Sequence, residues 1–309
     1  MTALETRGAV GTGRPNLLSR IFSGGDGVIY GLFFFGLALT AVVIIYPAFY
    51  AIELSFQKVE SFISEPEWIG LENYARVLSD PEFWSALQRG VVFAGTTIVL
   101  QVVLGIAIAM LLDAAIPFKR LVRGFAILPY LLPTLIVALV FRWMLNDPIG
   151  IFTVTADNLG FGIIDWFGTP GRAMALVITV SVWIWTPFVT VAVLAGLQSI
   201  PETLYEAAKV DGASAWQRFW HITLPQLSPV LTVVVLLRAI WMFNKFDIVW
   251  LLTGGGPLQG TEHLPILAYR KAFQSYDVGM GATVSTISFL ILTAGVLVYF
   301  KMFPLDTKD

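Results

Sequence analysis

Long runs of apolar residues, separated by short polar segments, recur along the chain and predict helices that cross a membrane. About 20 helical residues, each rising 1.5 Å, span a hydrocarbon core of about 30 Å. A shorter run, residues 124–141, ends at Arg142, and Trp143 and Met144 extend it if the arginine reaches outward to water. Four further runs contain no Asp, Glu, Lys or Arg, and they cover residues 27–52, 90–112, 173–200 and 278–300.

The remaining apolar run, residues 227–252, is long enough to span but carries Arg238, Lys245 and Asp247. At about 100° per residue, Arg238, Trp241, Met242 and Lys245 share one helix face, and Asp247 lies opposite. Counted from the start of the run, Arg238 is about 16 Å deep. A cation there costs about 2.5–3.5 kcal/mol unless it faces a polar cavity or a partner. This face therefore predicts a transport cavity.

The run at residues 173–200 repeats the same spacing with Ser181, Ile184, Trp185 and Phe188. Pro187 lies inside it, removes one backbone hydrogen bond and predicts a kink. Such breaks are often placed beside a transport cavity in membrane proteins. The two faces are therefore candidates for one solute site.

Composition supports a membrane protein. Of 309 residues, 57% are apolar and only 13% are charged, whereas about a quarter are charged in soluble chains. A net charge of −2 gives no signal for nucleic acid, and the absence of cysteine excludes disulfides and thiolate metal sites. The expected fold is all-α, a polytopic membrane protein with six transmembrane helices.

Basic residues predict the orientation of this bundle. Arg7, Arg14 and Arg20 precede the first span, and Lys119, Arg120 and Arg123 lie in a short loop. Because Lys and Arg favour the cytoplasmic side, both termini are expected inside the cell. On the outer side, Asp80-Pro81-Glu82 predicts a short helix through Leu87. The run from Gly254 to Pro257 is interpreted as a tight turn.

The loop at residues 199–225 has the signals of a helix–turn–helix on the cytoplasmic side. Ser199 with Glu202 and Ser214 with Gln217 each match a capping box, which begins a helix. Gly212 is expected to end the first helix, because glycine readily adopts the left-handed conformation found there.

The second short helix of this loop is bounded by Pro225 and carries Trp216, Phe219 and Trp220. This aromatic area exceeds what a solvated loop exposes, so we expect a partner to cover it.

The same loop resembles a known family. The string Glu206-Ala207-Ala208, Asp211-Gly212-Ala213, Phe219 and Ile222-Thr223-Leu224-Pro225 resembles the EAA loop of permease subunits in binding-protein-dependent ABC importers. In that family the loop is the coupling helix, which sits in a groove of the ATPase subunit. Motifs at residues 69–74, 80–84, 128–133, 246–247 and 253–257 resemble the carbohydrate-uptake branch, similar to the maltose and glycerol-phosphate permeases.

This resemblance implies an organisation and a set of partners. Residues 1–26 form a cytoplasmic tail outside the resemblance, and residues 27–309 form the importer's transmembrane domain, with the coupling loop at 199–225. The partners implied are a second homologous six-helix permease, two ATPase subunits, an extracytoplasmic solute-binding protein and the lipid bilayer of the bacterial inner membrane. No G-x-x-x-x-G-K-[ST] sequence occurs. We therefore expect no enzyme activity, metal or cofactor in this chain, with ATP and Mg²⁺ on the partner ATPase.

The resemblance also implies functional residues. The positions that contact sugar in the maltose-permease branch match Ser181, Ile184, Trp185, Phe188, Arg238, Trp241, Met242 and Lys245. The positions that couple to the ATPase match Glu206, Ala207, Ala208, Asp211, Gly212, Ala213, Phe219 and Pro225. Two cations replace neutral polar groups of the maltose pattern. The solute is therefore expected to be a sugar or sugar-like molecule, with an anionic one (sulfonated, uronic or phosphorylated) as a hypothesis.

Two other classes remain as alternatives. An ion-gradient-driven secondary carrier also suits six spans with intramembrane charges and a broken helix. An intramembrane enzyme is disfavoured, because the chain has only His221 and His263, interpreted as bystanders, and lacks H-E-x-x-H and G-x-S-x-G motifs.

Overall fold

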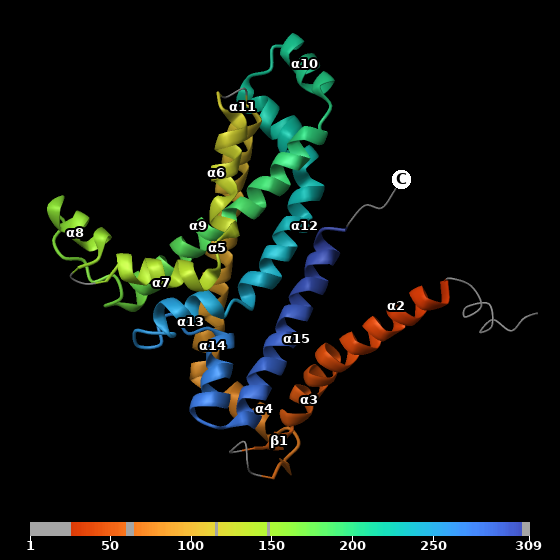
Figure 1. The fold of residues 1–309 in the computed structure, drawn as a ribbon, viewed down its shortest axis with the longest axis vertical. Helices are drawn as coiled ribbons and strands as arrows, with labels where there is room; N and C mark the ends of the chain where they lie inside the picture. The colour runs from red at the N-terminus through yellow and green to blue at the C-terminus, as the bar shows by residue number, and fades with distance from the viewer. Residues whose placement is uncertain (1–25, 60–64, 115–116, 147–148, 305–309) are drawn as a thin grey trace, which may run out of the picture. The chain divides into compact units, whose positions relative to one another are not determined.

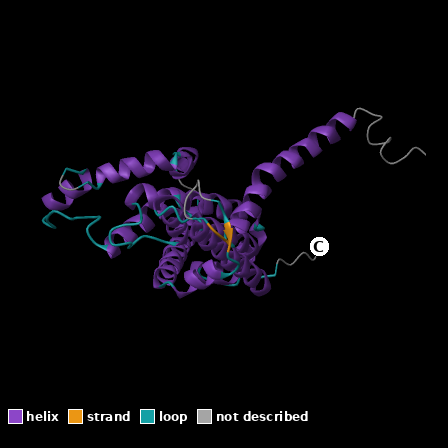
Figure 2. Cartoon of the chain, turned by 90° about the horizontal axis from the view of Figure 1, so that it is seen from below, coloured by secondary structure: helices purple, strands orange, loops and turns teal. Residues whose placement is uncertain are grey.

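The computed structural model describes residues 26–59, 65–114, 117–146 and 149–304, and these residues are mainly helical, with loops between the helices (Figure 2). The strands are β1 (Gln57–Lys58) and β2 (Glu67–Trp68), which pair antiparallel. The chain divides into two compact units, residues 1–53 and 54–309. Apart from its last position, the predicted cytoplasmic tail at residues 1–26 lies outside the described residues.

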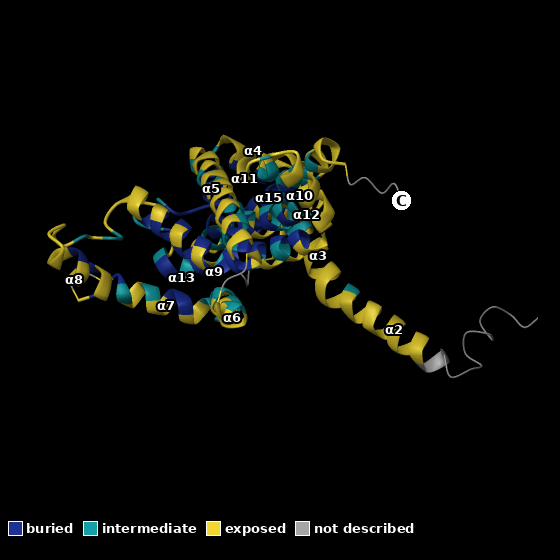
Figure 3. Cartoon of the chain, turned by 90° about the horizontal axis from the view of Figure 1, so that it is seen from above, coloured by how far each residue is buried: buried dark blue, intermediate teal, exposed yellow. Residues whose placement is uncertain are grey.

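The first unit contains the first predicted span. Helix α2 (Asp26–Thr40), the π-helix η1 (Ala41–Ile45) and the start of α3 (Tyr46–Leu54) follow one another without a break. From Ile29 to Leu54 this stretch is long and apolar enough to cross a membrane. Its side chains are exposed along α2 (Figure 3). A helix that is apolar on all sides and unburied within its own chain requires lipid or another subunit around it.

The second unit is built on three long helices that contact one another. Helix α5 (Pro81–Asp113) packs along α9 (Pro170–Ser199), and α12 (Leu224–Phe243) contacts both (Figure 1). A Cβ added to Gly105 would lie 2.6 Å from Cγ1 of Val189, and one on Gly196 would lie 2.8 Å from Cδ2 of Leu227. Small residues at these crossings let the backbones approach closely. Helix α15 (Val278–Met302) is the last span.

The shorter apolar run, residues 124–141, does not form one straight span. It is divided into α6 (Lys119–Leu131) and α7 (Thr134–Met144), which meet at 91°. Leu132 is extended (φ −79°, ψ 135°) because the following Pro133 disfavours helical backbone at that residue. The described residues therefore contain five helices that could span a membrane, or six if this bent pair is one span.

The run at residues 227–252 is also divided. A continuous helical stretch begins at Ala215 and ends at Phe243, and Asp247 opens a separate helix, α13 (Asp247–Thr253). The prediction that Asp247 lies opposite Arg238 on one helix is therefore wrong. The depth of about 16 Å for Arg238, counted from Leu227, stays a prediction.

Short helical segments connect the longer helices. They comprise α4 (Glu72–Ser79), α8 (Ile151–Asn158), α14 (Leu264–Tyr269) and η3 (Arg270–Gln274). The predicted cap at Asp80 is confirmed, since its carboxylate accepts from the Glu82 N–H at 2.9 Å. The helix that begins there is the first part of α5 and not a separate short helix. Gly254 (φ 60°) ends α13 and opens the predicted tight turn.

The loop at residues 199–225 contains the predicted helix–turn–helix, at the opposite end of this unit from α14 (Figure 1). Helix α10 (Glu202–Val210) ends before Gly212, whose φ is +77°. The Ser214–Gln217 capping box is confirmed at the start of α11 (Ala215–Arg218). The Ser199 box is wrong, because α9 continues to Ser199 and this hydroxyl donates to the Gly196 carbonyl at 2.7 Å.

The sequence predicts that Pro225 bounds the second short helix, and this prediction is wrong. A π-helical turn, η2 (Phe219–Thr223), joins α11 directly to α12. The Leu224 N–H bonds to the Phe219 carbonyl, five residues back, and Pro225 follows in the first turn of α12. The π-turn just before Pro225 lets the continuous helix from Ala215 to Phe243 accommodate a residue that lacks an N–H.

Candidate functional site

The centre of the candidate site is Arg238, whose side chain is buried between α5, α9 and α12 (1% exposed). Its Nε donates to Oε1 of Gln101 at 2.8 Å. The amide nitrogen of Gln101 in turn donates to the Ser181 carbonyl at 3.0 Å. Gln101 therefore joins the three helices through two hydrogen bonds.

Three aromatic rings surround the guanidinium and form an aromatic cage (Trp185, Phe188 and Trp241). The Cζ atom of Arg238 lies 5.9, 5.9 and 5.7 Å from the three ring centroids. Nη2 approaches the sulfur of Met242 at 3.6 Å. At these distances the negative ring faces attract a cation. Among the described residues, no carboxylate forms a salt bridge with Arg238.

Lys245 lies in the break between α12 and α13, and its ammonium is a second cation beside the aromatic cage. Its Nζ lies 4.0 Å from the Trp185 ring centroid and 3.1 Å from Oδ1 of Asp247. The helical face predicted for Lys245 is wrong, because α12 ends at Phe243. The side chain still meets the cage through Trp185.

The predicted solute residues differ in accessibility. Ser181, Ile184 and Met242 are buried, as is Trp185, and the Ser181 hydroxyl has no partner in the described part of the chain. Trp241 is 42% exposed, while Phe188 and Lys245 are partly exposed. The accessible part of the site is therefore aromatic and cationic (Phe188, Trp241 and Lys245). The Ser181 hydroxyl is buried and is not accessible to a solute in this conformation.

Two residues at the site were not predicted. Gln101 carries the acceptor for Arg238, and Tyr130, at the end of α6, lies 6.1 Å from Phe188 between ring centroids. The signal for Gln101 was available, because it is a lone amide inside a span without charged residues. Nothing in the helical spacing of Tyr130 indicated its contact with α9, since the bend at Pro133 sets it.

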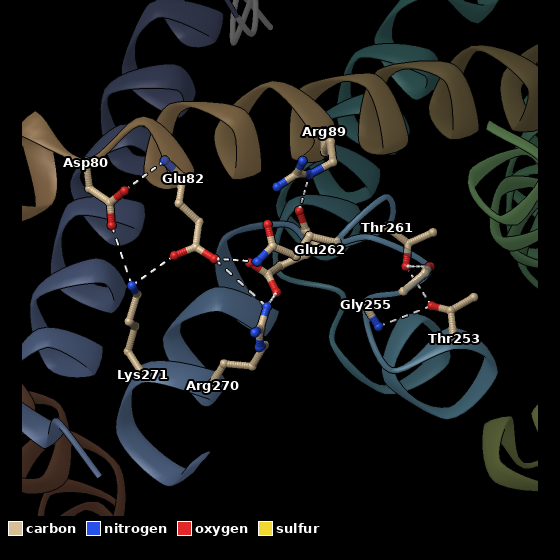
Figure 4. Close-up of polar contacts among 11 residues, drawn as sticks. Asp80, Glu82, Arg89, Thr253, Gly255, Thr261, Glu262, Arg270 and Lys271 are labelled. Atoms are coloured by element: carbon tan, nitrogen blue, oxygen red, sulfur yellow. Dashed lines mark hydrogen bonds and ion pairs between the residues drawn. The ribbon is translucent and has the colours of Figure 1, made fainter. Parts of the chain in front are cut away.

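A second polar group, the Glu262 cluster, lies where the start of α5 meets the segment between α13 and α15. It comprises Asp80, Glu82, Arg89, Glu262, Arg270 and Lys271 (Figure 4), together with Gln259, whose amide donates to Glu82 at 2.9 Å. Arg270 pairs with the buried carboxylate of Glu262, and Lys271 lies 2.9 Å from Glu82. The Arg89 Nε donates to the Glu262 carbonyl at 2.7 Å. These contacts join the start of α5 to the segment between α13 and α15.

Burial and ion pairing oppose each other in the titration of this cluster. It raises the pKa of Glu262, although the hydrogen bond and charge of Arg270 act in the opposite direction. For Lys271, burial acts to lower the pKa, but the contacts with Glu82 and Asp80 outweigh it and raise the pKa. Each cation of the cluster thus faces a carboxylate or a carbonyl.

His263 follows directly and links this cluster to the candidate site. Its Nε2 lies 2.7 Å from the Lys245 carbonyl, and the residue is 1% exposed. Burial lowers the pKa of His263 to about 4, so the imidazole is neutral at physiological pH. His263 was interpreted from the sequence as a bystander, and the structure gives it a buried structural contact.

The predicted coupling residues occupy the helix–turn–helix. Glu206, Ala207 and Ala208 lie on α10 and Asp211, Gly212 and Ala213 form the turn. Trp216 is 69% exposed and stacks on Phe219. A cavity of about 710 Å³ lies beside them, lined in part by Glu202, Tyr205, Lys209, Arg218 and Phe219.

A polytopic helical bundle with a buried cation between its long helices, and exposed aromatics on a loop at one end, defines a membrane transport subunit. In the described part of the chain, no group of three or more His, Asp or Glu side chains is arranged to hold a metal. The chain belongs to the family of binding-protein-dependent transport system inner membrane components, whose model matches residues 101–303.

Relatives and a solved structure agree with this membership. The chain is 38% identical over 266 residues to the trehalose/maltose transport system permease protein MalF of Thermococcus litoralis (86% of this chain, 90% of that one). It is 32% identical over 272 residues to the sulfoquinovosyl glycerol transport system permease protein SmoG of Agrobacterium fabrum (88% of each). A crystal structure of a bacterial ABC transporter that imports the acidic polysaccharide alginate matches with a TM-score of 0.82 at 20% identity (94% of this chain, 99% of that one). The last likeness shows a shared fold.

The resemblance to permeases of binding-protein-dependent ABC importers is therefore confirmed. The chain is a multi-pass inner-membrane transport component and not an enzyme. None of these relatives is named as a secondary carrier.

Proposed function

We propose that this chain forms part of an ATP-driven importer and carries a sugar or sugar-like solute across the cytoplasmic membrane by alternating access. Three relatives match this chain over more than two thirds of their own length. They are named for the transport of trehalose and maltose, of sulfoquinovosyl glycerol and of diacetylchitobiose. Alternating access in such a protein requires a site between helices that opens to either side in turn. The cage between α9 and α12 suits that position.

The solute we propose is anionic, and the observation that carries this proposal is the environment of Arg238. Its hydrogen-bond acceptor is a neutral amide, and its other neighbours are a thioether and three rings. A buried charge is costly unless a partner compensates it. A sulfonate, carboxylate or phosphate on the solute would supply that partner, while Trp185 and Trp241 would stack on the apolar face of the sugar ring.

Coupling is assigned to the helix–turn–helix at residues 199–225. Glu206 makes polar contacts at the joint with an ATPase subunit, Gly212 supplies the turn, and Trp216 and Phe219 present apolar area to that subunit. ATP and Mg²⁺ belong to two partner ATPases, and the assembly includes a second six-helix permease and an extracytoplasmic solute-binding protein. The basic residues near the first span and at Lys119–Arg123 support cytoplasmic termini.

The first experiment purifies this chain with an affinity tag, expressed from its native operon, in mild detergent, and identifies co-purifying proteins by mass spectrometry. Recovery of an ATPase with a G-x-x-x-x-G-K-[ST] motif and a second six-span protein is expected. A homo-oligomer that transports on an ion gradient without either protein would contradict the proposal.

Solute charge is tested with Lys245→Met in the assembled transporter reconstituted into liposomes. The variant keeps the apolar stem over Trp185 and removes the charge, so uptake of an anionic sugar is expected to lose about tenfold in affinity. A neutral disaccharide serves as the matched control and should lose little. Undiminished neutral uptake together with no binding of any anionic sugar would refute the anionic solute.

Coupling is tested at Gly212, where a side chain has space but the backbone is left-handed (φ +77°). Gly212→Val is expected to cost about 1–2 kcal/mol locally, because a β-branched residue is disfavoured there. Solute-stimulated ATPase activity of the assembly should fall accordingly. Gly212→Asn is the matched control, since asparagine tolerates this conformation. Equal activity of the two variants would contradict the role of this turn.

A further inference from the structure

At the break between α12 and α13, the Lys245 carbonyl receives no backbone donor from either helix. The Lys245 N–H bonds back to Met242 at 3.3 Å, and the first bond of α13 runs from Trp250 to Phe246 at 2.9 Å. The Lys245 carbonyl is thereby freed from the helical pattern. A carbonyl that is withdrawn from both helices and partly shielded from water favours a donor, and Nε2 of His263 supplies it at 2.7 Å.

His263 is itself held in place by its own surroundings. Its carbonyl accepts from the N–H groups of Ile266 and Leu267 at 2.9 and 3.0 Å, which begins α14. Its ring lies 5.6 Å from that of Phe93 on α5. The preceding residue, Glu262, is bound through its carbonyl to Arg89 and through its carboxylate to Arg270. These contacts hold the His263 imidazole in place independently of its bond to Lys245.

We infer that His263 is a positioning residue for solute recognition, because it fixes the backbone from which the Lys245 ammonium reaches Trp185. This inference rests on the proposed role of Lys245 at the solute site. Lys245 lies in a non-helical link, so no helical hydrogen bond holds its carbonyl, and the imidazole is the contact that does. Without it, the Lys245 side chain would lose its fixed approach to the cage.

The chemistry of the contact defines which replacements preserve it. A carbonyl oxygen can only accept, so Nε2 carries the proton and the ring is the neutral Nε2–H tautomer. A glutamine side chain places its amide N–H near the position of Nε2. An asparagine side chain is shorter by one methylene and ends near Nδ1. Gln and Asn therefore form a matched pair of similar polarity that differs in reach.

The test compares His263→Gln with His263→Asn in the assembled transporter in liposomes. For an anionic sugar, the KM of uptake is expected to rise about tenfold in the Asn variant and to stay near wild type in the Gln variant. Basal ATPase activity should be equal in the two. In a Lys245→Met background, His263→Asn should raise KM no further, because the group that His263 positions is already absent. Equal KM values for Gln and Asn would overturn the inference.

A second measurement follows the break without using solute. The chain contains no cysteine, so Val249→Cys, at a buried position on α13, is a unique thiol. Maleimide labelling of this chain is expected to be slow with His263 or Gln and fast with Asn. Equal labelling rates in Gln and Asn would overturn the inference. If Lys245→Met leaves KM unchanged, the solute role of Lys245 fails instead, and the positioning role falls with it whatever the labelling shows.

Discussion

Arg238 and Arg270 lie in the same unit of the molecule, but they meet opposite electrostatic surroundings. Arg270 pairs with the buried Glu262 and lies 3.9 Å from Glu82. Arg238 is more deeply buried, and its partners are a neutral amide, a thioether and three aromatic rings. One arginine is compensated by carboxylates and the other is not.

The difference separates a structural contact from the binding contact that we propose for Arg238. The Glu262 cluster joins segments up to 191 residues apart in the chain, because Lys271 reaches Asp80. Charges that pair with opposite charges in this way hold such segments together and have less to offer a ligand. An arginine supported only by neutral groups keeps most of its charge available, which suits recognition of an anion. Three substitution tests follow from this contrast.

The largest effect is expected for Arg270→Met, which leaves the carboxylate of Glu262 buried without its partner. Removing one member of a buried ion pair costs about 3–5 kcal/mol. Because the Arg270 side chain is 34% exposed, we expect a loss of about 2–3 kcal/mol in stability. Thermal unfolding of the assembled complex measures it, with the exposed Arg120→Met as control. Equal melting temperatures for the two variants would remove the structural role of the cluster.

A smaller effect is expected from the pair Gln101→Leu and Arg238→Met. Gln101→Leu leaves the Arg238 Nε–H without its acceptor, at a cost of about 1.5–3 kcal/mol. Arg238→Met replaces the cation with an apolar side chain of similar length, so its stability cost should stay within about 1 kcal/mol while anionic uptake is lost. The double variant should be more stable than Gln101→Leu alone. Additive losses would show that the two side chains are not coupled.

The third test concerns pH and His263. Its pKa is about 4 in the folded chain, against about 6.5 when unfolded, so the unfolded chain binds more protons between these values. The stability that the neutral imidazole contributes is present above pH 6.5 and is lost as pH falls toward 4. The melting temperature of the wild type should therefore decline over this range relative to His263→Gln. Parallel pH profiles of the two would contradict a buried neutral histidine.

Several features were predictable from local sequence because local physics decides them. Apolar length predicted the spans at α2–α3, α5, α9 and α15, since about 20 apolar residues suffice to cross the hydrocarbon. The Asp80 cap, the Ser214–Gln217 box and the left-handed Gly212 were each confirmed. Each depends on contacts within four residues, and the chain specifies these without help from distant segments.

The same local rules were wrong where several options compete over short distances. Ser199 remained in α9 and bonded backward, although its spacing to Glu202 matched a capping box. Pro133 divides the run at residues 124–141 into two helices, whereas the helix that contains Pro225 continues through a π-turn. Length and composition do not distinguish a proline that breaks a helix from one that a π-turn accommodates. The backbone conformation of the neighbouring residues determines which of the two occurs.

The sequence by itself determined the class of protein and, through its loop motif, the family. It also predicted that Trp185 and Phe188 share a face of α9 and that Trp241 and Met242 share the face of Arg238, but not the place of Lys245. Only the tertiary structure decided how the charges are paired. Gln101 meets Arg238 across 137 residues, and Lys245 meets both Asp247 and His263 because α12 ends at Phe243. Helical periodicity predicts which side chains share a face. Which charge is compensated depends on what packs against that face, and this is a property of the folded bundle.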